Sequence, residues 1–293
     1  MIEWKPNRLL GTTTLLVAIL AIVLLDLFLF TYVQAQHFSL GTFVLAVLLG
    51  VTAPILAYLA YMLYQLRTLN YLLDRDSITI RCGGIRHVIP IHATQVVSGG
   101  EDETPVPGRR FPWPGYWVGD FPGGTVLYYA TEPPSRHILI RSRNRAYAIT
   151  PENPGGFLRS VESRQTLGPS QRAVESTARA EWMDWPFWRD RSAQGLILAG
   201  LLANVALFGA LAAAFASVPQ LVPIHYDASG MVDRIAPRIE LLRVPAIGAI
   251  TWSVNTFLGL ALHRWESLAT YLLAAVAVLV QALLAIALYR IVT

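Results

Sequence analysis

The sequence is poor in cysteine, in lysine and in charge of either sign. Cys82 is the only cysteine and Lys5 the only lysine among 293 residues. A single cysteine excludes an intrachain disulfide, and no cysteine–histidine cluster has the spacing of a structural zinc site. Charged residues make up only 14% of the chain, whereas soluble domains average about 25%. The net charge of +4 is not gathered in one basic segment, so nucleic-acid binding is not expected.

Motifs of the common enzyme classes are also missing. The sequence has no glycine-rich phosphate-binding loop, no Gly-x-Ser-x-Gly nucleophile turn and no His-Glu-x-x-His zinc helix. We therefore expect a protein that is not an enzyme, with no catalytic residue, no bound metal and no cofactor.

Apolar residues, in contrast, are abundant. They form 54% of the chain, and the mean hydropathy is +0.45. A helix needs about 20 consecutive apolar residues to cross the hydrocarbon core of a bilayer. Five stretches reach this length: Leu9–Tyr32, Leu40–Leu63, Leu196–Val218, Val244–Leu262 and Leu268–Leu288. We therefore predict an integral membrane α-helical protein with five spans. The first stretch is longer than the apolar region of a signal peptide, which has about 7–15 residues, so we expect it to stay uncleaved.

Basic residues near the ends of the spans predict the orientation in the membrane. They precede the first span, follow the second and precede the third: Lys5, Arg8, Arg67, Arg75, Arg189 and Arg191. The loop between the first two spans carries no charge. We therefore expect a cytoplasmic N-terminus and a cytoplasmic segment from Arg67 to Arg191. The loop Leu221–Arg243 would then lie outside, although its arginines, Arg238 among them, oppose the rule.

The segment from Arg67 to Gln165 has short alternating runs that are typical of strands. In "SITIRCGG" the alternation points Ile78, Ile80 and Cys82 inward, and Gly83-Gly84 is a hairpin turn signal. The runs "TVLYYAT", "RHILIRS" and "AYAIT" predict three further strands. A helix follows, capped by Thr150 or Asn153, with an apolar stripe of Phe157, Leu158 and Val161. This order favours a small α+β barrel that is capped by its C-terminal helix.

Three stretches of this segment, "YLLDRDSITIRCGGIRHVIPI", "GYWVGDFPGGTVLYYAT" and "AYAITPENPGGFL", together resemble bacterial pleckstrin-homology-like (PH) domains. The resemblance covers about 100 residues and implies the PH-type barrel with its C-terminal helix. It implies little about activity, because this fold is a general platform. We divide the chain into a two-span hairpin (1–66), the cytoplasmic PH-like domain (67–165), a linker with a juxtamembrane aromatic segment (166–192) and a three-span membrane domain (193–293).

Two groups of side chains in the PH-like domain are candidates to face lipid or a protein partner. The first is a set of arginines on adjacent strands: Arg136, Arg141, Arg143 and Arg145. Each could contribute roughly 1 kcal/mol beside an anionic membrane surface. The second is formed by Trp113 and Trp117 in the long loop 99–124. The alternatives are a solvated hairpin face for the arginines and packing over the barrel for the rings.

The stretch "LVPIHYDASGMVDR" carries the most specific motif, which consists of Pro223, His225, Asp227, Gly230 and Asp233. This pattern resembles a bacterial membrane domain of unknown function that also occurs in proteins of the sporulation-delaying-toxin immunity type. One interpretation is structural: Asp227 bonds amides of its own turn, Gly230 supplies a positive φ, and His225 with Asp233 clamps the loop. A divalent metal site and proton sensing through His225 are the alternatives.

These features predict a bacterial inner-membrane protein that acts as a sensor, scaffold or immunity-type factor, with the bilayer and a protein partner as its contacts. The alternative is a transporter or channel subunit, because four polar residues lie within the predicted spans: Asp26, Asn204, Asn255 and Gln281.

The predicted orientation can be tested with single cysteines introduced at Arg143 and Ser229. A membrane-impermeant thiol reagent added to intact spheroplasts should label the cysteine at 229, and the cysteine at 143 should react only after the membrane is opened. Labelling of both positions from the same side would contradict the number of spans.

Overall fold

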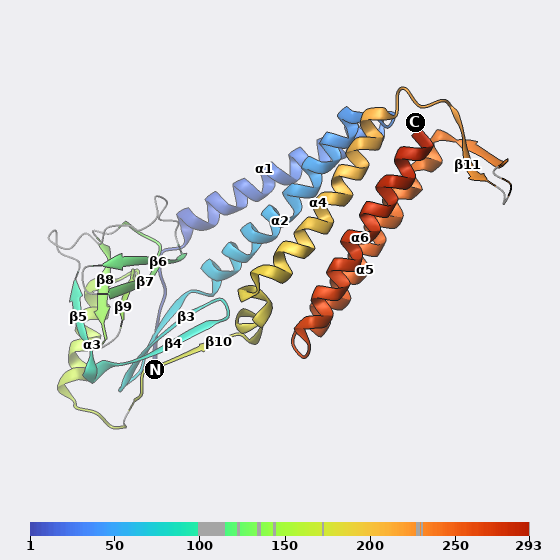
Figure 1. The fold of residues 1–293 in the computed structure, drawn as a ribbon. Coiled ribbons are helices and arrows are strands. Elements are labelled where there is room, and N and C mark those ends of the chain that lie inside the picture. Colours follow the sequence, from blue (N-terminus) through green and yellow to red (C-terminus); the bar gives the residue numbers. More distant parts are fainter. Residues whose placement is uncertain are drawn as a thin grey trace. The chain divides into compact units, whose positions relative to one another are not determined.

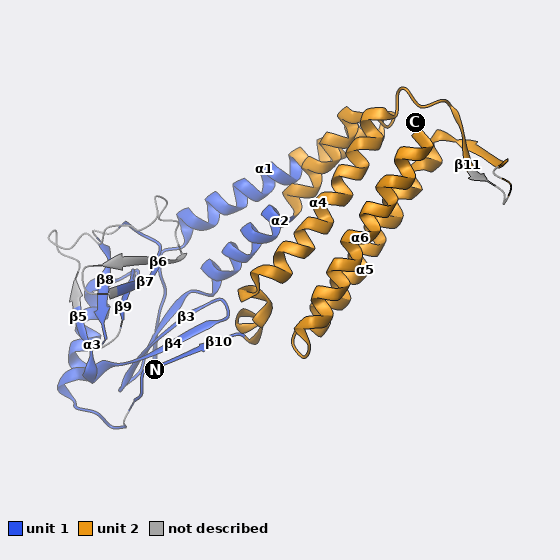
Figure 2. Cartoon of the chain, in the orientation of Figure 1, with its two compact units in different colours: residues 1–24, 54–180 blue, residues 25–53, 181–293 orange. Residues whose placement is uncertain are grey.

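The computed structural model of the chain describes residues 1–98, 115–121, 124–133, 136–142, 145–171, 173–226, 229 and 231–292 (Figure 1). Two compact units divide these residues (Figure 2). Unit 1 comprises residues 1–24 and 54–180, and unit 2 comprises residues 25–53 and 181–293.

Five helices within the described residues are long and apolar enough to cross a membrane. They are α1 (Leu9–Gln34), α2 (Leu40–Thr68), α4 (Arg191–Ala214), α5 (Arg243–Leu262) and α6 (Ser267–Val292). Large apolar side chains are exposed along all five, as on Phe28, Leu202 and Phe257. Such faces are unfavourable in water and suited to lipid. The prediction of a multi-pass α-helical membrane protein is therefore confirmed.

Unit 1 contains two five-stranded sheets. The first has the order β1-β2-β3-β4-β10 and is antiparallel throughout. Its strands are β1 (Ile2–Trp4), β2 (Asn70–Leu73), β3 (Ser77–Cys82), β4 (Ile85–Pro90) and β10 (Ser176–Arg179). The second sheet has the order β5-β8-β9-β7-β6, in which only β7 and β9 pair in parallel. Its strands are β5 (Gln95–Ser98), β6 (Gly115–Phe121), β7 (Gly124–Ala130), β8 (Ile138–Arg141) and β9 (Ala146–Ile149).

The two sheets and helix α3 (Pro154–Thr166) share one hydrophobic core. Ile78, Ile80 and Cys82 point into it, as their alternation predicts. Phe157 and Val161 of α3 are also buried there, and the side chain of Asn153 caps the helix by accepting a hydrogen bond from the amide of Gly156. No sheet formed by the described residues is closed, so closure into a barrel stays a prediction.

Strands β1 and β2 flank the helical hairpin of α1 and α2 in the chain and pair with each other. Ile2 lies opposite Leu73 and Trp4 opposite Tyr71. The segment between β1 and α1 is fixed to the domain as well, because the guanidinium of Arg8 donates to the carbonyl of Leu69. The chain on both sides of the hairpin α1–α2 is therefore part of one sheet.

Unit 2 contains α4, α5, α6 and a short hairpin of β11 (Leu221–Tyr226) and β12 (Val232–Pro237). Its apolar core includes Leu207 and Leu211 of α4, Leu241 of the 3-10 turn Arg238–Leu242, and Leu288 of α6. Two further 3-10 turns, Glu181–Asp184 and Pro186–Arg189, precede α4. They carry Trp182 and Trp188 of the juxtamembrane segment, and Trp185 lies between them.

The hydroxyl of Tyr71 connects the two sheets of unit 1, and its removal should destabilise the domain. It donates to the carbonyl of Tyr129 and accepts from the amide of Thr150, and full burial raises its pKa. Tyr71→Phe leaves both backbone groups buried without this partner, so we expect a loss of about 1–3 kcal/mol in the free energy of unfolding. Tyr58→Phe, at an exposed position of α2, is the control. Equal denaturation midpoints in detergent for the two variants would contradict the bridge.

Candidate functional site

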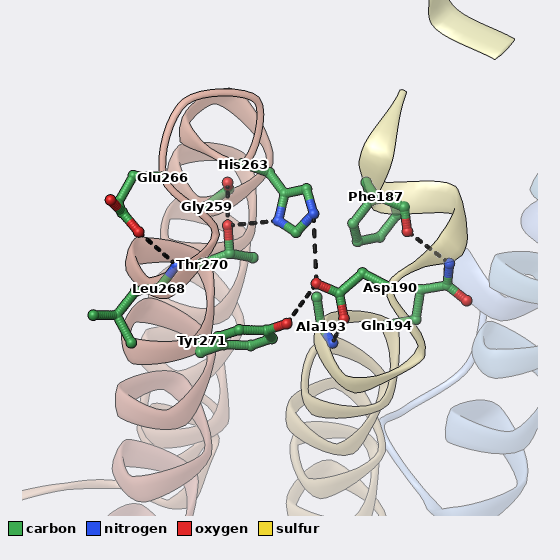
Figure 3. A network of polar contacts seen from close by, with 10 residues as sticks. All are labelled: Phe187, Asp190, Ala193, Gln194, Gly259, His263, Glu266, Leu268, Thr270 and Tyr271. Atoms are coloured by element: carbon green, nitrogen blue, oxygen red, sulfur yellow. Dashed lines mark hydrogen bonds and ion pairs between the residues drawn. The ribbon is translucent and has the colours of Figure 1, made fainter. Parts of the chain in front are cut away.

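A chain of polar side chains connects the ends of three spans (Figure 3). Asp190 is the N-cap residue of α4, and His263 follows the last residue of α5. Thr270 and Tyr271 lie in the first turns of α6. The Nε2 atom of His263 lies 3.5 Å from the Oδ2 atom of Asp190, and the hydroxyl of Tyr271 donates to the same oxygen at 2.6 Å.

The local sequence explains why Asp190 stands at this place. Its Oδ1 atom accepts a hydrogen bond from the amide of Ala193 at 2.9 Å, which satisfies one free amide of the first turn of α4. The amide of Gln194's side chain donates to the carbonyl of Phe187 at 2.9 Å and fixes the preceding turn. A carboxylate at a helix N-terminus is also favoured by the helix dipole. The cap thus positions the second oxygen of Asp190 toward α5 and α6.

The directions of the hydrogen bonds determine which proton His263 carries. The hydroxyl of Thr270 donates to the carbonyl of Gly259 at 2.8 Å, so it must accept from Nδ1 of His263, 3.1 Å away. A neutral ring with its proton on Nδ1 would turn the lone pair of Nε2 toward the Asp190 carboxylate. The imidazolium form instead makes an ion pair there. His263 is only 4% exposed, and the Phe187 ring packs edge-on against it.

The order Asp190, His263, Thr270 resembles the acid–histidine–nucleophile relay of hydrolases, but this geometry does not activate a nucleophile. Thr270 is 1% exposed, and its hydroxyl proton is committed to a helix carbonyl. The amide of Ala193, and after it the hydroxyl of Tyr271, lowers the pKa of Asp190. The network therefore holds a charged carboxylate between three helices. Sequence reasoning missed it, although Asp190 stands shortly before the apolar run that begins at Leu196, where an N-cap is expected.

A second polar cluster lies within the spans. The side-chain amide of Asn204 on α4 donates to the carbonyl of Pro245 at 2.9 Å and to Oε1 of Gln281 at 3.0 Å. Gln281 on α6 in turn donates to the carbonyl of Gly248 on α5 at 2.8 Å. A Cβ on Gly248 would clash with Oε1 of Gln281 and with the side-chain amide of Asn204, so a side chain there would displace this network. The structure thus brings together two of the four predicted intramembrane polar residues, as interhelical hydrogen bonds.

Of the predicted loop motif, Pro223 lies in β11 and Asp233 in β12. The side chain of His225 and the residues Asp227 and Gly230 lie outside what the structure describes, so the clamp, metal and proton-sensing interpretations stay predictions. Arg238, which opposes the charge rule for orientation, donates to the carbonyls of Phe215 and Val218 at 3.0 and 3.1 Å. It therefore binds free carbonyls at the C-terminal end of α4, where a cation is favoured.

Three of the candidate lipid- or partner-facing arginines, Arg136, Arg141 and Arg145, lie in or beside the paired strands β8 and β9. Arg136 pairs with Glu132 at 3.3 Å just before β8, whereas Arg141 ends that strand. Arg145 accepts, through its carbonyl, a hydrogen bond from the amide of Ser142 in the turn before β9. Arg143 and Trp113 lie outside the described residues, and of Trp117 only the backbone in β6 is described. Their proposed contacts stay predictions.

Comparison with protein families finds a match for one region of each unit. Residues 69–165 match the family model of the bacterial PH domain, and residues 202–249 match that of a domain of unknown function (DUF1648). The chain thus combines five helices that are long and apolar enough to span a membrane with two regions similar to known families. One is similar to bacterial PH domains and the other to DUF1648, as the sequence motifs indicate. No curated protein and no solved structure gives a significant match.

The charge of Asp190 should stabilise unit 2 in a pH-dependent way. Because its folded pKa lies below the ordinary carboxyl value, the stabilisation is present above that value and is lost as the pH falls through the folded pKa. Asp190→Asn keeps the cap acceptor and removes the charge. The melting temperature of the parent in detergent should exceed that of Asp190→Asn at about pH 5, and the difference should shrink toward about pH 3.

The control is Asp184→Asn, which removes the charge of an exposed carboxylate in the 3-10 turn Glu181–Asp184. A difference between parent and Asp190→Asn that is independent of pH, or an equal effect of Asp184→Asn, would show that the charge of Asp190 does not contribute.

Proposed function

We propose that this protein is a non-enzymatic sensor or scaffold of the bacterial inner membrane, whose PH domain binds a protein partner in the cytoplasm. An immunity-type factor, which binds or resists a membrane-active toxin, is one form of this function. The observation that carries the proposal is the pairing of β1 with β2, which makes the ends of α1 and α2 part of the domain's own sheet.

This pairing matters because it leaves no free linker between the domain and two spans. Only the residues between Trp4 and Leu9 separate β1 from α1, and only Leu69 separates α2 from β2. Arg8 and the bridge between Pro6 and Pro151 fix the first of these connections. A partner that shifts the sheet would therefore shift the ends of the two helices, as a sensor requires.

The charge distribution supports a cytoplasmic position for the domain. Arg67 lies in the last turn of α2, and Arg75 follows that helix. Arg189 precedes α4, and Arg191 is its first residue, in agreement with the positive-inside rule. Since α4 begins, α5 ends and α6 begins at the Asp190–His263 network, this orientation assigns the network to the cytoplasmic side as well.

One observation favours the alternative of a transporter or channel subunit. The Oδ1 atom of Asp26, within α1, is buried and has no hydrogen-bond partner among the described residues. An unsatisfied carboxylate in a span is a common element of proton pathways. Asn204 and Gln281, by contrast, form hydrogen bonds between helices and are used in helix packing.

Photocrosslinking in living cells tests the proposed function. A crosslinking amino acid is introduced into the full chain at Arg159 or Glu162, which are exposed on α3 of the PH domain. We expect a discrete adduct with a second polypeptide from at least one of these positions. Leu20 and Leu279, which are exposed on the apolar faces of α1 and α6, serve as controls and should give lipid adducts only.

A parallel measurement addresses the alternative. Purified protein in proteoliposomes with an internal pH dye should not increase proton permeability over empty vesicles. Proton flux that Asp26→Asn abolishes, together with no protein adduct from the α3 positions, would overturn the sensor or scaffold assignment in favour of transport.

A further inference from the structure

The hairpin of β11 and β12 in unit 2 has one covered face and one uncovered face. Val222 lies opposite Ala236, both side chains are buried, and Val222 belongs to the apolar core of the unit. Side chains alternate along a strand, so the neighbouring pairs of the register point to the other side. These pairs form what we call the outer face: Leu221 opposite Pro237, and Pro223 opposite Ile235.

The outer face is apolar and exposed. Leu221 and Ile235 are each 63% exposed, and Met231, directly before β12, is 68% exposed. The face of an antiparallel sheet that contacts water is usually polar. Apolar side chains that are exposed together mark a surface that contacts a protein or a membrane. The outer face is therefore an interaction surface.

The base of the hairpin is fixed at the ends of the spans. The amide of Arg238 donates to the carbonyl of Gln220 at 2.9 Å, and its guanidinium binds the carbonyls of Phe215 and Val218, just after α4. Figure 1 shows the hairpin extending sideways from the ends of these helices, across their direction rather than along it. Because the helices cross the membrane, a hairpin in this position lies at the depth of the lipid headgroups.

Exposed apolar side chains also continue along the chain from the outer face into a surface that faces lipid. Ile239 lies in the 3-10 turn between β12 and α5, and Ile247 and Ile250 lie one turn apart on α5. Each of the three is more than half exposed. The hairpin and the first turns of α5 therefore offer the same kind of surface to the bilayer.

The charged groups of the hairpin are compatible with lipid headgroups. The guanidinium groups of Arg234 and Arg243 lie 3.9 and 2.8 Å from Oε2 of Glu240, and their side chains are 62% and 66% exposed. Asp233 is a further exposed acid of β12. An arginine can cover apolar surface with its methylene stem and keep its guanidinium among water and phosphates. These charges therefore need not leave the interface when the apolar face enters it.

We propose that the outer face binds the lipid surface, so that the hairpin is an interfacial anchor in the plane of the membrane. Apolar side chains gain free energy when they enter the boundary between headgroups and acyl chains. The sideways direction of the hairpin and its continuity with α5 favour lipid over a protein partner or a second copy. The loop motif that includes Pro223 and Asp233 then lies at the lipid surface. The proposal holds for either orientation of the chain and does not depend on the proposed function.

The test uses the full chain in nanodiscs of phosphatidylethanolamine and phosphatidylglycerol, with bimane attached to single cysteines. The parent should take up no label, because Cys82 is fully buried. In Ile235→Cys, a lipid with a nitroxide at its headgroup should quench bimane strongly, and iodide in the water should quench it weakly. Ile247→Cys on α5 should behave in the same way. Arg159→Cys, exposed on α3, should show the reverse.

A further variant separates the effect of the protein's own side chains from that of the label. Leu221→Ser, added to Ile235→Cys, removes an exposed apolar side chain of the outer face, so it should leave the fold intact. Quenching by the lipid nitroxide should fall by about half or more, because less apolar surface holds the hairpin in the interface.

Three results would overturn the proposal. The first is iodide quenching at position 235 that equals quenching at position 159, which would place the outer face in water. The second is lipid quenching that Leu221→Ser leaves unchanged, which would assign the contact to the label. The third is protection of position 235 from both quenchers, which would show that a protein surface, such as a second copy, covers the outer face.

Discussion

The pairing of β1 with β2 is the interaction on which the rest of unit 1 depends. Two antiparallel spans that are joined by a short loop necessarily return the chain to the same side of the bilayer. The strands at their ends, three and four residues long, could not persist alone. Paired with each other and with β3, they satisfy their backbone groups and bring Trp4 against Phe157 of the domain's core. The domain and the two helix ends thus form one folding unit.

Unit 2 obeys a related constraint, because polar groups without partners are costly in lipid. Buried polar side chains of α4 and α6 are therefore used between helices. Asn204 and Gln281 hold α4, α5 and α6 within the spans, and Asp190 with His263 holds the same helices at their ends. A side chain on Gly248 would displace the first network, and the second uses the acid that caps α4. Both fix the register of the three helices.

The spans, the inward alternation of β3 and the cap of α3 were predictable, since each follows from a local pattern. The His263–Asp190 pair was not, because hydropathy marks where spans end but not which ends meet. Strand β1 is too short for a periodic signal, and β10 lies in a segment whose sequence reads as a linker. Arg238 counted against the expected orientation because the positive-inside rule treats every arginine near a span as solvated. In the structure, this arginine instead binds carbonyls at the end of α4.

The central claim, that β1 joins the PH domain to the span hairpin, is tested most directly by disulfide trapping in the native membrane. Glu3 lies opposite Leu72 in the register, and Leu72 lies opposite Thr79 of the next strand. In a Cys82→Ala background, cysteines at 3 and 72 should crosslink rapidly under mild oxidation. Cysteines at 3 and 79 should not, because two strand spacings of about 4.8 Å exceed the roughly 7 Å limit for a disulfide. Equal or absent crosslinking of the two pairs would contradict the account.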